Sequence, residues 1–171
     1  MKKFTFFAAI AMMAFTTNAV AQSEATDFAV TNAKVITPIT ISKTVDMNFG
    51  NLVSTLLGGA IVLPTSGART GDATILAGPD GSPTAASFTV GGEGTYTYGI
   101  TLPDASFDVS NSDTTPATMA VGTFVSLPDT TGALTAGTQT LLVGATITLG
   151  ATQASGLYTN ATEMIVTVFY N

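Results

Sequence analysis

The sequence of 171 residues contains no histidine, no cysteine and no tryptophan, and only 9% of its residues are charged. Without imidazole or thiol side chains, Ser-His-Asp and Cys-His nucleophiles are excluded, as are zinc, copper and haem sites held by these ligands. Disulfide bonds are excluded for the same reason. Stability must come from burial and hydrogen bonds, and 46% hydrophobic residues are enough for a core. We therefore expect neither an enzyme nor a bound cofactor or metal.

The first residues predict a signal peptide. Lys2 and Lys3 precede an apolar stretch, residues 4–15, that is too short to cross a membrane. The small residues Ala19 and Ala21 stand three and one positions before Gln22, which is the spacing of a cleavage site. We expect an exported protein with no membrane span in its mature chain. Its location would be the periplasm, the cell surface or the medium.

The mature chain would be acidic and poor in cations. The whole sequence has a formal net charge of −6 at pH 7. Its cations after cleavage would be Lys34, Lys43 and Arg69, too few for a surface that binds nucleic acid phosphates or anionic lipids. We therefore expect no nucleic acid partner.

Three carboxylates, those of Asp104, Asp108 and Asp113, are the residues most open to a chemical interpretation. They could serve hydrolysis or calcium binding only if they faced one cleft, and spacing along the chain does not show this. Aspartates at strand ends commonly form turns, which is the interpretation we prefer.

The remaining residues favour sheet. Threonine occurs 32 times, with abundant valine, isoleucine and glycine, whereas good helix formers are scarce. No stretch outside the signal peptide has a clear 3.6-residue period, and the loops are too short to contain crossover helices. We predict an all-β antiparallel sandwich. Its eleven strands are expected at Phe28–Val35, Ile39–Ile41, Val45–Leu52, Ala60–Leu63, Ala73–Leu76, Ala85–Val90, Tyr96–Leu102, Phe107–Val109, Met119–Leu127, Gln139–Leu149 and Met164–Tyr170.

Alternation along these runs predicts which faces are buried. One face carries Ala86, Phe88 and Val90, and another carries Leu141, Val143, Ala145, Ile147 and Leu149. The final run differs because it is apolar on both faces, so we expect it in the centre of a sheet or beside something that covers it.

Three groups of segments follow one another along the chain. They are residues 39–50 (ITISKTVDMNFG), residues 86–90 with 96–103 (ASFTV and YTYGITLP), and residues 142–147 with 153–158 and 166–170 (LVGATI, QASGLY and VTVFY). Together they resemble the DUF4402 family of exported bacterial β-sandwich proteins. The resemblance covers about residues 35–171.

Three shorter motifs are Asn48-Phe49-Gly50, the turn from Gly156 to Tyr158, and the penultimate Tyr170. They resemble the spore coat protein U group, which includes archaic chaperone-usher pilins. The resemblance implies an incomplete immunoglobulin-like sandwich. Its missing strand would come first from a periplasmic chaperone and then, at an usher, from the N-terminal extension of the next subunit. Partners would then be copies of the same chain, with a chaperone and an usher.

The sequence contains a candidate donor strand and a candidate acceptor strand for such strand exchange. A donor strand could use Phe28, Val30 and Ala33 in residues 22–35, and an acceptor strand could use Met164, Val166, Val168 and Tyr170. Two arrangements stay open. Residues 22–35 either extend to another subunit of a fimbria or surface assembly, or fold back as the first strand of a self-contained monomeric surface or periplasmic binding module. The predicted organisation is a signal peptide at 1–21, this segment at 22–35 and a sandwich domain at 36–171.

Overall fold

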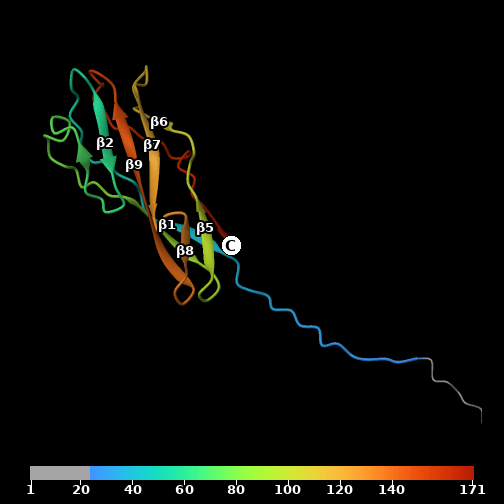
Figure 1. Ribbon diagram of the computed structural model, residues 1–171. Helices are drawn as coiled ribbons and strands as arrows, with labels where there is room; N and C mark the ends of the chain where they lie inside the picture. Colours follow the sequence, from blue (N-terminus) through green and yellow to red (C-terminus); the bar gives the residue numbers. More distant parts are fainter. Residues whose placement is uncertain (1–23) are drawn as a thin grey trace, which may run out of the picture. The chain divides into compact units, whose positions relative to one another are not determined.

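The computed structural model describes residues 24–171, so the predicted cleavage site at Ala19, Ala21 and Gln22 lies outside the described residues. The chain divides into two units after Val35, and residues 36–171 form the sandwich domain (Figure 1). The described residues form ten strands and no helix, which confirms the all-β fold class. No helix that is long and apolar enough to cross a membrane occurs in residues 24–171.

The strands are short except for two. They are β1 (Thr40–Val45), β2 (Gly59–Leu63), β3 (Thr70–Gly71), β4 (Ala86–Gly91), β5 (Thr97–Thr101), β6 (Phe107–Ser110), β7 (Thr118–Leu127), β8 (Thr131–Ala133), β9 (Thr138–Leu149) and β10 (Thr167–Tyr170).

The larger sheet is built around β9. Its order is β1-β4-β9-β2-β3, and β7 pairs with β9 and carries β6 on its outer side. The first half of β9 pairs with β4 and the second half with β2, while β7 pairs along the opposite edge. We call the end of the domain at Thr138, where β9 begins, the base, and the end at Leu149, where β9 finishes, the tip.

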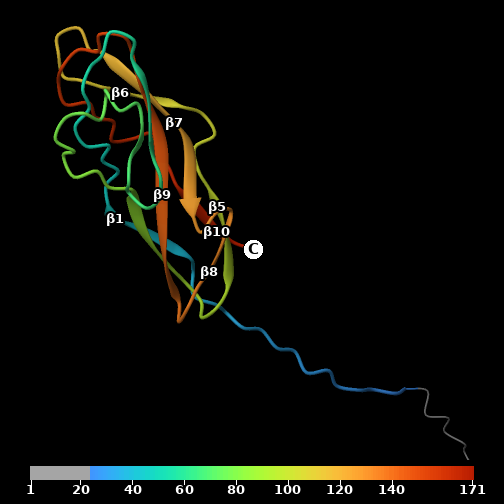
Figure 2. The ribbon, with the colours of Figure 1, turned by 60° about the vertical axis from the view of Figure 1, so that its left-hand side comes forward.

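The smaller sheet has the order β10-β5-β8, and all its pairs are antiparallel. Both ribbon views place β5 and β8 beside the half of β9 that begins at the base (Figures 1 and 2). Tyr98 of β5 and Leu134 pack in one core cluster with Phe88, Val90 and Leu141 of the larger sheet. The smaller sheet therefore covers only the base half of the larger one, and the structure is the predicted antiparallel sandwich.

The predicted core faces are confirmed. Ala86, Phe88 and Val90 are buried, and so is the whole alternating face of β9 from Leu141 to Leu149. A second core cluster lies at the tip half of β9 and includes Ile61, Ile75 and Ile147. This cluster has no second sheet over it among the described residues, and irregular segments pack against it instead.

Four predicted strands are wrong or too long, three of them in the first half of the chain and the fourth at its end. Residues 24–39 form no strand, because no described strand pairs with them. Ala73–Leu76 is a turn: Asp72 accepts hydrogen bonds from the backbone and hydroxyl of Thr74, and Ile75 alone supplies the burial that resembled a strand. Val45–Leu52 leaves β1 at Val45 and keeps only a bridge from Asn48 to Thr84.

The last strand is shorter than predicted and is not central. It begins at Thr167, because Ile165 N–H bonds back to Glu163 O and turns the chain before that point. β10 is an edge strand, paired with β5 alone among the described strands. Both faces of β10 carry apolar side chains, as expected. Phe169 lies on one face and is half exposed, and Val168 lies on the other and is partly buried.

Candidate functional site

Two sheet edges lie next to each other without pairing. β1 forms one edge of the larger sheet and pairs with β4, while β10 forms one edge of the smaller sheet and pairs with β5. The two strands are in contact, yet the described residues form no ladder between them. An unpaired edge presents backbone N–H and C=O groups that can accept a further strand.

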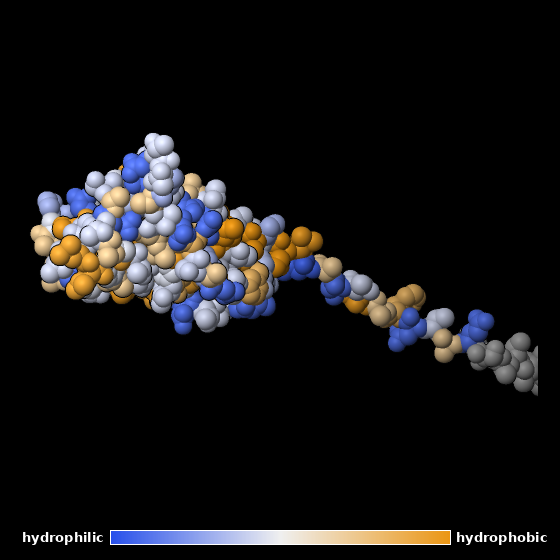
Figure 3. Space-filling view, turned by 90° about the horizontal axis from the view of Figure 1, so that it is seen from above, coloured by the Kyte–Doolittle hydropathy of each residue, from blue (hydrophilic) through white to orange (hydrophobic). Residues whose placement is uncertain are grey.

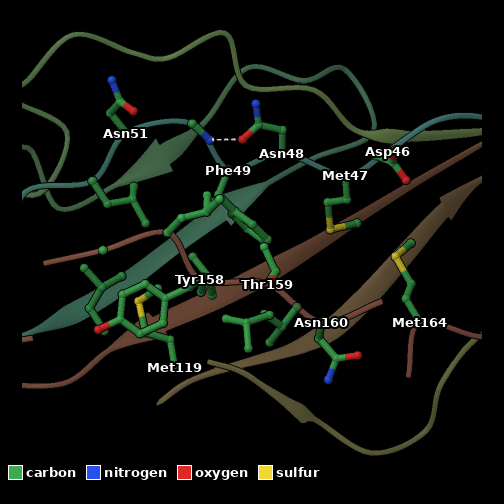
Figure 4. A pocket seen from close by; sticks show the side chains of 18 of the residues that line it. Asp46, Met47, Asn48, Phe49, Asn51, Met119, Tyr158, Thr159, Asn160 and Met164 are labelled. Atoms are coloured by element: carbon green, nitrogen blue, oxygen red, sulfur yellow. Dashed lines mark hydrogen bonds between the residues drawn. The ribbon is translucent and has the colours of Figure 1, made fainter. Parts of the chain in front are cut away.

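A groove with an apolar floor and a largely polar rim continues from these edges toward the tip. It has a volume of about 860 Å³ and lies between residues 46–52 on one side and residues 153–164 on the other (Figure 4). Its floor is the core face of the larger sheet, contributed by Phe107 and Val109 of β6, Met119 and Val121 of β7, and Ile147 and Leu149 of β9. The groove therefore opens directly onto the core cluster that lacks a covering sheet.

The first wall is a turn held by an arginine. Asn48 Oδ1 accepts a hydrogen bond from Gly50 N–H at 2.8 Å, and Gly50 has a φ of +70°, which favours glycine. Arg69 Nη1 donates to Phe49 O and to Asn51 O, each at 2.7 Å. One guanidinium thus fixes the wall that carries the Phe49 side chain into the groove.

The second wall is held by tyrosine and glutamine. Gln153 Nε2 donates to the Tyr158 hydroxyl at 2.9 Å and to Thr118 O at 3.1 Å, which ties the wall to β7. Thr159 forms a bridge with Ser110 of β6. Figure 4 shows Tyr158 and Thr159 across the groove from the Asn48–Phe49 turn. Two of the three short motifs that carry the pilin resemblance therefore line one groove from opposite sides.

Of the four predicted acceptor residues, one lines the groove. Met164 lines it, and Val166, Val168 and Tyr170 are partly buried against the core cluster beneath the smaller sheet. Met164 and Val166 precede β10 and so do not belong to the strand. The alternation of the sequence continues past the point where pairing with β5 stops, which made the predicted strand longer than β10.

Hydrogen bonds among Thr37, Glu93 and Tyr170, which the sequence did not predict, fix the chain at the base. The Tyr170 hydroxyl donates to Thr37 O at 2.8 Å and accepts from Glu93 N–H at 2.7 Å. Glu93 Oε2 accepts from both Thr37 N–H, at 3.1 Å, and Thr37 Oγ1, at 3.0 Å. The rings of Tyr170 and Tyr96 also pack in a T-shaped arrangement, with centroids 5.8 Å apart. The chain consequently enters the domain beside the end of β10.

The predicted donor residues belong to the unit that precedes Ile36. Phe28 is 95% exposed and Val30 is 86% exposed, and Ala33 is exposed as well.

The carboxylates considered at first do not gather into a site. Asp104, Asp108 and Asp113 are exposed, and Asp113 accepts a hydrogen bond from Asn111 Nδ2. Within residues 24–171 no three acidic side chains are grouped closely enough to hold a metal ion. The groove offers an apolar floor and backbone edges, which suit binding of an extended chain.

Comparison with protein families gives a match over nearly the whole domain. A family model described as "Domain of unknown function (DUF4402)" matches residues 39–170, which spans the domain from just before β1 to the end of β10. No curated protein matches the chain.

Proposed function

The chain belongs to the DUF4402 family, and from its open groove we propose that it is a non-enzymatic structural subunit of an exported fimbria-like or surface assembly. Copies would be joined by β-strand addition, in which an extended segment of one copy fills the groove of another. The observation that carries the proposal is a groove between residues 46–52 and 153–164 that continues from two strand edges, β1 and β10, which do not pair with each other.

The segment that best fits the groove is residues 28–35 of another copy. In an extended strand Phe28 and Val30 share one face, so both side chains can enter the groove while the backbone pairs with the edges. Eight residues at about 3.3 Å each span roughly 26 Å. Burying a phenylalanine or valine side chain contributes about 1.5–3 kcal/mol each.

Ala33 and Lys34 limit how far this pairing can extend. Lys34 shares the face of Phe28 and Val30, and a lysine ammonium is costly to bury without a partner. We therefore place the apolar contact at Phe28 and Val30 and expect Ala33, a small side chain on the opposite face, to lie at the outer surface near the end of the groove. A periplasmic chaperone would occupy the same groove before assembly, and an usher would exchange it for the segment of the next copy.

The proposal is tested by size-exclusion chromatography with light scattering on chain 22–171. The protein is refolded alone and then with a synthetic peptide of residues 22–35. We expect assemblies of several copies without the peptide and capped monomers with it. A matched peptide with Phe28→Asp and Val30→Asp should not cap, because both buried contacts are replaced by charge.

The alternative is a self-contained monomeric surface or periplasmic binding module in which residues 22–35 cover their own groove. A stable monomer that ignores the peptide would support that alternative and contradict strand addition between copies. Deletion of residues 22–35 separates the two in a second way. It should abolish assembly and leave a peptide-binding domain if the segment is a donor, whereas it should only destabilise a self-contained monomer.

A further inference from the structure

We propose that Met47 and Met164 are sites of reversible oxidation by peroxides, and that their sulfoxides close the groove to an apolar segment. The modification would regulate the groove in which we place strand addition, so this consequence rests on the proposed function. The oxidation itself does not depend on that function and is measured on the protein alone.

In residues 24–171 methionine occurs in the groove alone. The three methionines of this part of the chain are Met47, Met119 and Met164, and all three line the groove. Apolar character by itself does not single out this place, because hydrophobic side chains also lie in patches among polar ones on the face of the domain drawn in Figure 3. The thioethers therefore distinguish the groove from other apolar surface.

The three methionines differ in position and exposure. Met47 extends from the first wall and Met164 from the second, and Figure 4 shows the ends of these two side chains directed toward one another. Both are partly buried, whereas Met119 on β7 belongs to the floor and is 8% exposed. A small oxidant that enters the groove therefore reaches Met47 and Met164 before it reaches Met119.

No thiol or indole competes with these thioethers for a peroxide, because the sequence contains no cysteine and no tryptophan. With hydrogen peroxide, a lone pair of the sulfur atom attacks the O–O bond, one oxygen atom is transferred to sulfur, and the other leaves as water. Sulfur is oxidised by two electrons, which the peroxide accepts. Methionine sulfoxide reductases reverse the step: they oxidise a dithiol to a disulfide and release the sulfoxide oxygen as water.

A sulfoxide changes what the groove can hold. Oxidation converts a flexible apolar side chain into a polar one. The side chains of Phe28 and Val30 offer no hydrogen-bond donor to the new oxygen, and burying a polar group without a partner is unfavourable. Met47 and Met164 pack against the core clusters from their margins, so the fold should survive the change that weakens binding.

The test uses the protein expressed from its full sequence, treated with hydrogen peroxide and mapped by peptide mass spectrometry once the oxidant is removed. We expect Met47 and Met164 to gain an oxygen atom before Met119 does. A labelled 22–35 peptide, which contains no methionine, should then bind about tenfold more weakly in fluorescence anisotropy, because sulfoxide oxygens face its apolar side chains. Methionine sulfoxide reductases that act on the two epimers should restore the affinity.

The matched control is the double variant Met47→Leu and Met164→Leu, which preserves the apolar lining with side chains of similar volume. It should bind the peptide as the wild type does, and peroxide should leave its affinity unchanged. A second variant, Met119→Leu, should respond to peroxide as the wild type does. Far-UV circular dichroism checks that each variant and the oxidised wild type are folded.

The outcomes separate the two proposals. Oxidation of Met119 as fast as that of Met47 and Met164 would overturn the assignment of these two residues and leave strand addition intact. The same holds if the oxidised wild type binds the peptide as tightly as before, or if peroxide weakens binding by the double leucine variant.

Failure of the untreated protein to bind the peptide would overturn the proposed function itself. The order of oxidation would still decide whether Met47 and Met164 are the modified residues. Nile red, an uncharged apolar dye, would then replace the peptide as the probe of the groove, and unchanged dye binding after oxidation would overturn the effect assigned to the sulfoxides.

Discussion

Tyr98 lies across a glycine on the neighbouring strand of the smaller sheet. It pairs with Gly132, and a Cβ added to Gly132 would lie 2.2 Å from the tyrosine ring. The ring thus covers the space that a side chain would occupy, and Tyr98 is fully buried as a result. Phe169 covers Gly99 in the same way on the other side of β5.

We expect Gly132→Ala to lower the free energy of unfolding by about 1–3 kcal/mol, because the added methyl group must displace a buried ring. Chemical denaturation followed by tyrosine fluorescence measures this. The comparison variant is Gly94→Asn, at a position where an added Cβ meets no atom within 4 Å. Asparagine tolerates the positive φ of 46° there, so the loss should be smaller. Equal losses would contradict the role given to the Tyr98 ring.

Burial also makes Tyr98 sensitive to alkali. Desolvation raises the pKa of Tyr98 above its ordinary value of 10.0. The folded protein therefore keeps the phenol proton at a pH where the unfolded chain releases it, so stability is retained below about pH 10 and falls as pH rises beyond that.

Tyr98→Phe should lose about 1 kcal/mol at pH 8, from the hydrogen bond to Gln139 Oε1 at 2.8 Å. Between pH 9 and pH 11 its stability should fall less steeply than that of the wild type, measured by urea midpoints across this range. Parallel curves for the two proteins would show that Tyr98 does not cause the alkaline loss.

At the scale of the element, the first groove wall depends on one side chain. Arg69 is partly buried and donates to two carbonyl groups of residues 49–51. We expect Arg69→Met to lower the free energy of unfolding by roughly 2 kcal/mol or more, because hydrogen bonds from charged donors contribute about 1.5–3 kcal/mol each. The 22–35 peptide should also bind more weakly, as measured by anisotropy.

Lys43→Met is the control for charge. It removes one cation as well, but Lys43 is 57% exposed and pairs with an exposed Asp46. Such surface pairs contribute about 0–1 kcal/mol. If Lys43→Met destabilised the fold as much as Arg69→Met, loss of charge and not loss of the wall contacts would explain both.

Strands with full alternation could be predicted from the sequence, and short ones could not. β4 and β9 were predicted within one residue, since each has one uniformly apolar face. β8 was missed, because Thr131-Gly132-Ala133 has no apolar pattern and is a strand only through its pairing with β5. The failure at residues 45–52 has a local cause: the Asn48–Gly50 turn interrupts an apolar run that would otherwise continue β1.

At the scale of the whole molecule, the sequence indicated some residues near the groove but not the shape of the groove. Met164 lines it, whereas Val168 packs against the core cluster beneath the smaller sheet, and their role as acceptors stays a prediction. The groove itself depends on contacts far apart in the chain, such as Arg69 to Phe49 and Tyr158 to Gln153, that no local pattern specifies. Glu93 and Thr37, which fix where the chain enters the domain, were missed for the same reason.

The central claim is that the groove of one copy holds the segment of another, and the lack of native cysteine makes a direct measurement available. Two variants, Val30→Cys with an affinity tag and Met164→Cys without one, are mixed during refolding and oxidised. The Val62→Cys variant, on the outer face of β2 and 41% exposed, replaces Met164→Cys as the control.

The account predicts a tagged, disulfide-linked heterodimer from the Val30 and Met164 variants and little from the Val62 control. A second sample carries both substitutions, Val30→Cys and Met164→Cys, in one chain and should give a ladder of linked copies on a non-reducing gel. Linkage only within single chains, with no heterodimer on mixing, would contradict the account, because it would show that each domain fills its own groove.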